Sequence, residues 1–348
     1  MRYRHLLGMV TDSPWAILES KLAEITGMIE RITAGDELSD DQLDAIIAAR
    51  PQRPSPNTGA AVAVLSLWGT MLPRAGKMEQ SSGVIGTDQF AASFRFAMED
   101  PSVSAVVVSV DSPGGSVAGV EELASDVYRL RGRKPVVAVS DSLMASAAYW
   151  AMAGASEIVA TPSAMVGSVG VVAIHLDKSG AMEKAGVKAT VITHGRYKAE
   201  GSPFGPMSEE AIAHTQEEVS YYGGMFERAV ARGRGVPIAK VRADFGEGRV
   251  FNADKAKRAG MIDRVATLDQ VIGELAAGKW ARPMRAAAVS MTFGTTSTVT
   301  TMGEPLIFDA ADPGDEWIKP PEVVEDEPSR SASVEYRRRR LRVLAASG

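Results

Sequence analysis

The chain has 348 residues, of which 45% are hydrophobic and 23% are charged, enough for one mid-sized globular domain with appendages or for two small domains. Its formal net charge of −5 gives no reason to expect nucleic acid as a partner. It has no cysteine, which excludes disulfides, a thiol nucleophile and cysteine metal sites. We expect no metal and no cofactor, and a cytoplasmic location. The apolar run at residues 6–10 is too short for a signal peptide, and no stretch predicts a membrane anchor.

Three zones follow one another along the chain. Residues 1–58 are expected to form a helical N-terminal arm, with an amphipathic helix over residues 15–32 and a linker, PQRPSPNTG, that cannot continue a helix. Residues 59–278 alternate strand-like and helix-like segments and form the predicted functional domain. Residues 279–348 are rich in Thr and Ser, then acidic, then basic, which is typical of a low-order, scaffold-like tail.

The central zone has the rhythm of a parallel α/β sheet. Its strand candidates are continuous apolar runs, which suit strands buried on both faces, and helix-like segments lie between them. This alternation predicts βαβ units and a parallel sheet, and Ser208 is the expected N-cap of a longer helix that follows. The expected strands are 61–69, 104–111, 134–140 and 156–162, and the expected helices are 90–100, 120–132, 145–155 and 208–233.

Two glycines follow a strand in the segment VVVSVDSPGGSVAG. Gly114 and Gly115 allow the backbone to turn sharply and expose neighbouring N–H groups. Such groups are what an oxyanion needs, although an ordinary strand-to-helix turn uses the same residues. Neither glycine motif for phosphate binding, G-x-x-x-x-G-K-[ST] or G-x-G-x-x-G, occurs in the sequence.

Ser146 lies in SDSLMASAAYWAMAGA, at the start of a predicted helix and among alanines. The positive end of a helix stabilises developing negative charge, so this hydroxyl is a candidate nucleophile, with helix capping as its ordinary alternative role. A nucleophilic serine needs a base, and His175 and His194 both remain open as that base. Lys198 is another candidate, since burial can lower its side-chain pKa from about 10.4 far enough to accept a proton near pH 7.

Five segments, taken together and in order, resemble the signal peptide peptidase A family of serine proteases. The resemblance covers about residues 60–275. Any one of these motifs is common, but five in the same order are hard to reach by chance. The segments are DSPGGSV (111–117), MASAAYW (144–150), SAMVGSVGVV (163–172), HGRYKAEGSPFGPMSEE (194–210) and GRVFNADKAKRAGMIDRV (248–265).

This resemblance implies a fold and a role for individual residues. The fold would be crotonase/Clp-protease-like α/β, a superhelix of repeated ββα units with a parallel sheet, to which the arm and the tail are added. Ser146 would be the nucleophile and Lys198 the general base, and the hydroxyl of Ser168 would orient the lysine. Gly114 and Gly115 would help to form the oxyanion hole. The reaction would be the hydrolysis of peptide bonds through an acyl-enzyme.

The layout around this domain resembles that of phage head maturation proteases, which cleave scaffold and capsid proteins during assembly. We therefore expect protein substrates, a homo-oligomer, capsid, portal or scaffold partners, a place in the host cytoplasm or procapsid, and self-cleavage in the tail after about residue 280. Three alternatives stay open: a cellular soluble protease of the same family, an acyl-CoA enzyme of crotonase type, and a non-catalytic assembly protein. Valine at position 171 disfavours the Ser-His-Asp triad of Clp proteases.

Overall fold

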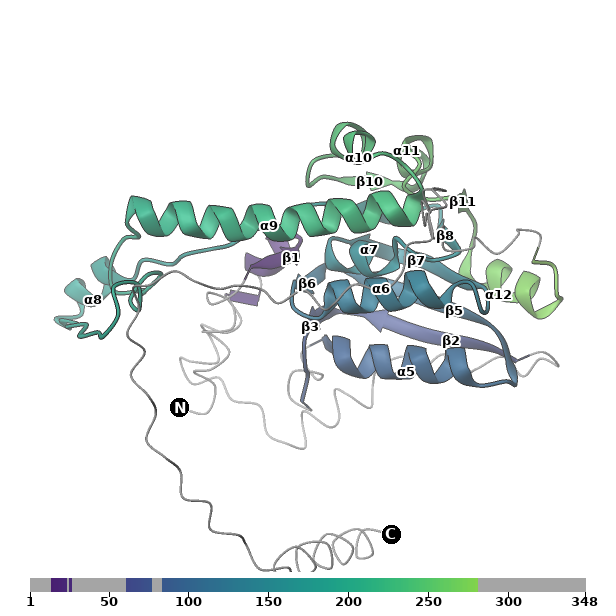
Figure 1. The fold of residues 1–348 in the computed structure, drawn as a ribbon, viewed down its shortest axis with the longest axis horizontal. Helices are drawn as coiled ribbons and strands as arrows, with labels where there is room; N and C mark the ends of the chain where they lie inside the picture. Colours follow the sequence, from purple (N-terminus) through teal and green to yellow (C-terminus); the bar gives the residue numbers. More distant parts are fainter. Residues whose placement is uncertain (1–13, 24, 27–60, 77–82, 281–348) are drawn as a thin grey trace, which may run out of the picture. The chain divides into compact units, whose positions relative to one another are not determined.

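The computed structural model of the chain describes residues 14–23, 25–26, 61–76 and 83–280 (Figure 1). Almost all of the expected tail, with its predicted self-cleavage, lies outside these residues, as does most of the expected arm. The domain boundaries near residues 58 and 278 therefore stay predictions. In the part of the chain that the structure describes, no helix is long and apolar enough to cross a membrane.

Strands and helices alternate through the described core, and the strands and helices expected in the central zone are present with shifted ends. In chain order the elements are β1 (Trp15–Ile17), β2 (Ala61–Trp68), β3 (Thr70–Leu72), β4 (Val84–Gly86), α5 (Thr87–Glu99), β5 (Val103–Ser112), β6 (Gly114–Ser116), α6 (Val120–Leu130), β7 (Val136–Ala145), α7 (Ala147–Met152), β8 (Glu157–Ala160), β9 (Met165–Gly167), α8 (Ser179–Lys184), α9 (Glu209–Arg234), α10 (Ile238–Asp244), β10 (Val250–Asn252), α11 (Ala253–Ala259), β11 (Arg264–Val265) and α12 (Leu268–Ala276).

The larger sheet is mainly parallel. Its order is β10-β9-β7-β5-β2, and β8 pairs with both β7 and β11. Among the described strands of this sheet, β10 alone runs antiparallel to its neighbour. Residues 137–140 of β7 pair with β8, whereas residues 143–145 pair with β9. The sheet therefore divides along β7, and the second half of this strand ends beside β9.

A smaller sheet continues the strands of the larger one. The chain turns at Gly69 and at Pro113 to pass from β2 into β3 and from β5 into β6, and β3 and β6 pair in parallel. A helix follows in each case, α5 after β3 and β4, and α6 after β6. This repeated order of strand, strand and helix confirms the predicted α/β class with a parallel sheet.

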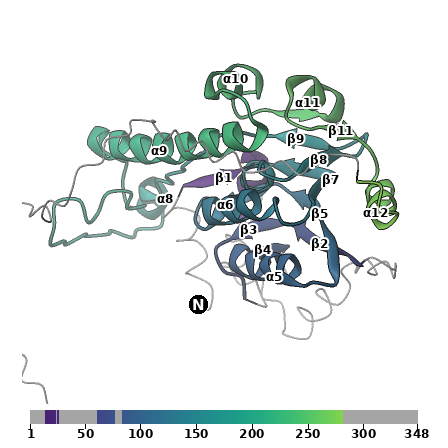
Figure 2. The ribbon, with the colours of Figure 1, turned by 45° about the vertical axis from the view of Figure 1, so that its right-hand side comes forward.

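Side chains of the larger sheet alternate between two hydrophobic clusters. In β5, Val106, Val108 and Val110 pack with α5, α6 and α7, whereas Ala105 and Val107 pack with α12. Figures 1 and 2 both show α5 and α6 alongside β2 and β5. Burial on both faces explains why the strands read as continuous apolar runs.

The predicted start of the arm helix at residue 15 is wrong. Residues 15–17 form strand β1, in which all three side chains are buried, and the helical turns begin only at residue 19. The backbone of β1 pairs antiparallel with β6. This pairing with a distant part of the chain outweighs the local helical pattern, as tertiary contacts often do.

Candidate active site

Ser146 lies at the sharp turn between β7 and α7. It is fully buried, and its φ of 54° and ψ of −120° are rare for a residue with a side chain. Its N–H donates to the Gly167 carbonyl at 2.8 Å, and its carbonyl accepts from Trp150 N at 2.9 Å. The hydroxyl does not cap α7, and Ser146 Oγ instead donates to the Gly170 carbonyl at 3.4 Å. A strained strand-to-helix turn that frees a serine hydroxyl in this way is the geometry of a nucleophile elbow.

Gly114 packs directly against this turn. A Cβ added to Gly114 would lie 2.9 Å from Ser146 Cβ, 2.9 Å from Ala147 N and 2.2 Å from the carbonyl oxygen of Ala16. Its φ of 100° also favours glycine. The glycine therefore leaves the space in which the serine, the first amide of α7 and a carbonyl group of β1 come together.

The amide groups of the two glycines differ. The Gly114 N–H donates to Ser112 Oγ at 3.2 Å and so has a partner. Gly115 is pressed against Met71, whose carbonyl oxygen would be 1.9 Å from an added Cβ. Gly115 is the register partner of Ala16 in β1 and of Met71 in β3, and it stays a candidate oxyanion donor. Ala147 N is a second candidate, because the first N–H groups of a helix have no partner within it.

Ser168 lies directly after β9 and beside Ser146. The parallel pairing of β7 with β9 places Ala145 opposite Gly167, so the residue that follows each of them is a serine. Ser168 has a φ of 55° and is 6% exposed. Its N–H donates to the Arg249 carbonyl at 2.8 Å, which ties the turn to the start of β10. The structure therefore brings both predicted serines to one place.

Two aromatic side chains fix the helix that follows the candidate nucleophile. Tyr149 is wholly buried, its hydroxyl donates to the Met261 carbonyl at 2.9 Å, and burial raises the pKa of Tyr149 above its ordinary value. Trp150 stacks on Phe226 of α9 with ring centroids 4.9 Å apart, and its Nε1 donates to Glu121 Oε2 at 2.9 Å. Buried aromatic rings whose polar atoms are paired hold α7 in one position.

Lys198 is not brought to Ser146 within one chain. It is an exposed residue in a turn, where its N–H donates to the Gly195 carbonyl at 3.2 Å. Figure 1 shows α8 and its connecting segments beside the start of α9, away from α7.

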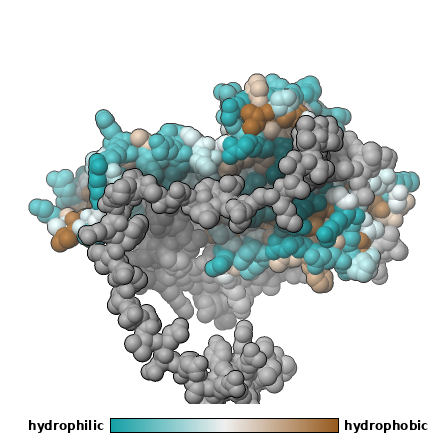
Figure 3. All heavy atoms as spheres, in the orientation of Figure 1, coloured by the Kyte–Doolittle hydropathy of each residue, from teal (hydrophilic) through white to brown (hydrophobic). Residues whose placement is uncertain are grey.

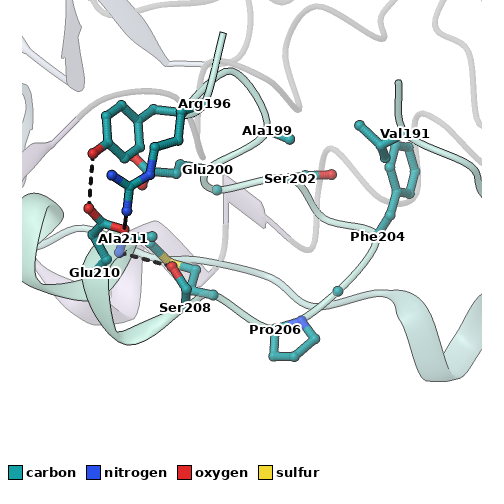
Figure 4. A pocket seen from close by; sticks show the side chains of 14 residues that line it. Val191, Arg196, Ala199, Glu200, Ser202, Phe204, Pro206, Ser208, Glu210 and Ala211 are labelled. Carbon is teal, nitrogen blue, oxygen red and sulfur yellow. Dashed lines mark hydrogen bonds and ion pairs between the residues drawn. The ribbon is translucent and has the colours of Figure 1, made fainter. Parts of the chain in front are cut away.

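Side-chain contacts place this turn at the first residues of α9. Arg196 and Tyr197 both contact Glu210, with Arg196 Nη2 at 2.9 Å and the Tyr197 hydroxyl at 3.0 Å from its carboxylate (Figure 4). The helix α9 meets α7 at Phe226, where Trp150 stacks. At a rise of about 1.5 Å per residue, these two contacts on α9 are about 24 Å apart.

The same turn lines a pocket of about 400 Å³ near the start of α9. Phe204, Pro206 and Ser208 line its wall, as Figure 4 shows. Ser208 is the N-cap of α9 and accepts from Ala211 N at 3.1 Å, which confirms the predicted helix start.

The alternative bases are also away from the serine. His175 Nε2 lies 3.1 Å from the Gly205 carbonyl oxygen, and His194 is exposed near Lys198. Within the described residues, no hydrogen bond joins either ring to Ser146.

Two parts of this site lie outside the sequence-based prediction. The amide of Ala147 has a recognisable signal, because the residue after a nucleophile on such a turn commonly supplies an oxyanion donor. The strand Trp15–Ile17 has no such signal, because its place depends on pairing with residues far along the chain.

Comparisons with known proteins agree with the motifs. The model of Peptidase family S49 matches residues 129–282. The head-tail preconnector protein GP5 of Enterobacteria phage P21 is 33% identical over 215 residues, 62% of this chain and 42% of that protein. The capsid assembly protease C of Escherichia phage lambda is 28% identical over 274 residues, 77% of this chain and 62% of that protein. The chloroplastic serine protease SPPA of Arabidopsis thaliana is 26% identical over 212 residues, 61% of this chain and 31% of that protein.

The chain spans less than two thirds of the length of these curated relatives. The matched range contains Ser146, Ser168 and Lys198. The resemblance drawn from the motifs is thereby confirmed, since residues 129–282 match the model of Peptidase family S49.

Proposed function

We propose that this chain is a serine endopeptidase that hydrolyses peptide bonds through an acyl-enzyme on Ser146. The observation that carries this proposal is the buried turn at Ser146, where Ala147 N and Gly114 meet the serine inside a peptidase family S49 sequence. A hydroxyl freed from capping beside the first N–H group of a helix is suited to acyl transfer.

In the proposed reaction, Ser146 Oγ gives its proton to the neutral amine of Lys198 and attacks the substrate carbonyl carbon. The N–H groups of Ala147 and Gly115 hold the oxyanion that forms. The lysine then protonates the leaving amine as the peptide bond breaks, and water hydrolyses the ester on Ser146. Ser168 serves as a positioning residue, whose hydroxyl orients the lysine amine.

In this proposal, the Lys198 that serves each Ser146 comes from a second copy of the chain. The turn that carries Lys198 sits at the far end of α9 from α7, so a short shift within one chain does not join the two residues. A partner copy also satisfies the expectation of a homo-oligomer, because a heterologous contact repeats around a closed ring.

The exposed surface around Lys198 supports a contact with another copy of the chain. No described residue from 171 to 210 is buried. On the face drawn in Figure 3, apolar atoms reach the surface at the end of the molecule that carries α8. Exposed apolar patches of this kind commonly mark protein contacts. The exposed large apolar residues of this segment and of the first half of α9 are Val187, Val191, Ile192, Tyr197, Phe204, Ile212 and Tyr221.

The substrates we propose are scaffold or capsid proteins of a phage head, cut in the host cytoplasm or the procapsid. The names of two relatives, a capsid assembly protease and a head-tail preconnector protein, support this choice. A cellular soluble protease is the alternative, and the chloroplastic serine protease among the relatives supports it.

The test is proteolysis of an unfolded protein such as casein by the purified full chain. We expect Ser146→Ala to abolish cleavage while the fold remains, because alanine suits the start of a helix. Ser93→Ala, at an exposed serine on α5, is the matched control and keeps full activity. Cleavage by a folded Ser146→Ala protein would refute the proposal.

The base is tested by replacing Lys198. Lys198→Arg should be nearly as inactive as Lys198→Ala, because arginine stays protonated and cannot accept a proton. Wild-type activity in Lys198→Arg would show that Lys198 is not the base, and His175 would be the next residue to replace.

A further inference from the structure

The strand β1 pairs on both of its sides with segments that border the candidate active site. On one side, Trp15, Ala16 and Ile17 pair antiparallel with Ser116, Gly115 and Gly114 of β6. On the other side, Trp15 and Val172 exchange two backbone hydrogen bonds of 2.8 Å each. An extended segment bonded along both edges is how many proteins hold a peptide substrate or ligand.

Both of the segments that pair with β1 also lie beside Ser146. The strand β6 begins with Gly114, which packs against Ser146 Cβ. The other edge contains Gly170, whose carbonyl accepts from Ser146 Oγ at 3.4 Å. The segment 14–18 therefore lies close to the candidate nucleophile, which is fully buried.

The position of the Ala16 carbonyl group indicates which bond of this segment would be cut. A Cβ on Gly114 would touch Ala16 O, Ala147 N and Ser146 Cβ at once. Ala16 is also the register partner of Gly115. The Ala16 carbonyl thus lies at the proposed oxyanion donors and beside the serine, where the carbonyl of a bond to be cut belongs.

The side chains of β1 fit the groove in an alternating way. Trp15 and Ile17 are 2% and 5% exposed and pack in a cluster with Leu22 and Leu72. The side chain of Ala16 points into the main core, where it is completely buried. The groove therefore accepts large apolar side chains at the two flanking positions and a small one at the central position.

We propose that residues 14–18 are a substrate built into the chain and that Ser146 cuts the bond between Ala16 and Ile17. This inference rests on the proposed function. Ser146 Oγ adds to the Ala16 carbonyl carbon, the bond from that carbon to Ile17 N breaks, and the serine proton leaves with the Ile17 amine through the base. Water then cleaves the ester, restores the serine and leaves a carboxylate on Ala16. Other substrates enter the groove only after this segment has left it.

The experiment follows the intact mass and the N-terminal sequence of the purified full chain during incubation, for wild type and Ser146→Ala. We expect wild type to give a new N-terminus at Ile17 and a fragment that ends at Ala16, and Ser146→Ala to stay uncut. Ala16→Gly should still be cut, whereas Ala16→Leu should not, because the central position has no room for a large side chain. The matched control is Glu19→Ala, an exposed residue just beyond β1, which should be cut like wild type.

A parallel assay on casein separates two kinds of failure. If wild type digests casein while the bond between Ala16 and Ile17 stays intact, this inference is overturned and the proposed function stands. If wild type cuts neither casein nor itself, the proposed function fails and the inference fails with it. Equal cutting at Ile17 in Ser146→Ala, or cutting of Ala16→Leu like wild type, also overturns the inference.

Discussion

Ser146 and Ser168 are the first residues after two neighbouring parallel strands, and they share nearly the same φ, 54° and 55°. The residues before them, Ala145 and Gly167, are register partners in β7 and β9. The two hydroxyl-bearing residues are therefore held side by side by the sheet itself. This relationship places Ser168 beside the candidate nucleophile through strand pairing.

Replacing Ser168 should slow the reaction without unfolding the protein. We expect Ser168→Ala to lower kcat by about 10- to 100-fold, the usual effect of losing a group that orients a reactive one. Ser168→Gly should lose the same activity, although glycine relieves the positive φ and should not reduce stability. Casein kinetics and thermal unfolding of both variants check this. Full activity in either variant would contradict a positioning role.

The Gly114→Ala variant should lose activity because its Cβ has no space. The added atom would collide with Ser146, with Ala147 N and with the Ala16 carbonyl, and the positive φ adds strain. The control is Gly132→Ala, where nothing lies within 4 Å of an added Cβ. Activity assays and circular dichroism on both variants test the point, and an active Gly114→Ala protein would show that the turn at Ser146 tolerates movement.

The ion pair between Arg234 and Asp263 should matter more for stability than a surface pair. Its two hydrogen bonds are 3.0 and 3.1 Å long, and the side chains are only 4% and 7% exposed. Burial alone would lower the pKa of Arg234, but Tyr149 and Asp263 raise it above its ordinary value, so the arginine stays charged. Asp263→Ala leaves this buried charge unpaired and should cost about 3–5 kcal/mol in the free energy of unfolding.

The control for this variant is Asp244→Ala, which breaks the exposed ion pair with Lys240 on α10. It should change the free energy of unfolding by no more than about 1 kcal/mol. Urea unfolding of both variants measures the difference. Equal losses of unfolding free energy in the two variants would contradict the expectation that the buried Arg234 pair stabilises the fold more than a surface pair.

Asp126 should make the free energy of unfolding depend on pH in the acidic range. Burial alone would raise the pKa of Asp126, but hydrogen bonds from Arg129 and Arg95 outweigh it and hold the pKa below its ordinary value. A carboxyl group with a lowered pKa in the folded state stabilises the protein above its unfolded pKa of about 3.9, and this is lost as pH falls through the folded pKa.

The measurement is urea unfolding of wild type and Asp126→Asn between pH 7 and acidic pH. Wild type should be more stable at neutral pH by no more than about 1 kcal/mol, because the pair is only partly buried. The difference should shrink as the pH falls below about 4. A difference that stays constant over this range would contradict the assignment.

Local patterns predict much of the fold but only part of the site. The apolar runs predict the strands β2 and β5, and the motif around Ser146 predicts the turn at the candidate nucleophile, because these features depend on neighbouring residues. The strand Trp15–Ile17 escapes this approach, since its partner β6 lies far along the chain. Local patterns also do not predict the separation of Lys198 from Ser146. Sequence spacing does not show that the turn with Lys198 lies at the start of the long helix α9, far from α7.

The central claim is that each active site combines Ser146 of one copy with Lys198 of another. The most direct measurement mixes inactive Ser146→Ala protein with inactive Lys198→Ala protein, allows the copies to exchange, and follows casein cleavage. We predict that activity returns to about a quarter of the wild-type value, because about a quarter of the contacts then join an intact serine to an intact lysine. The control mixes Ser146→Ala with a variant that carries both changes, and it should stay inactive. If the first mixture also stays inactive although mixed oligomers form, the account is contradicted.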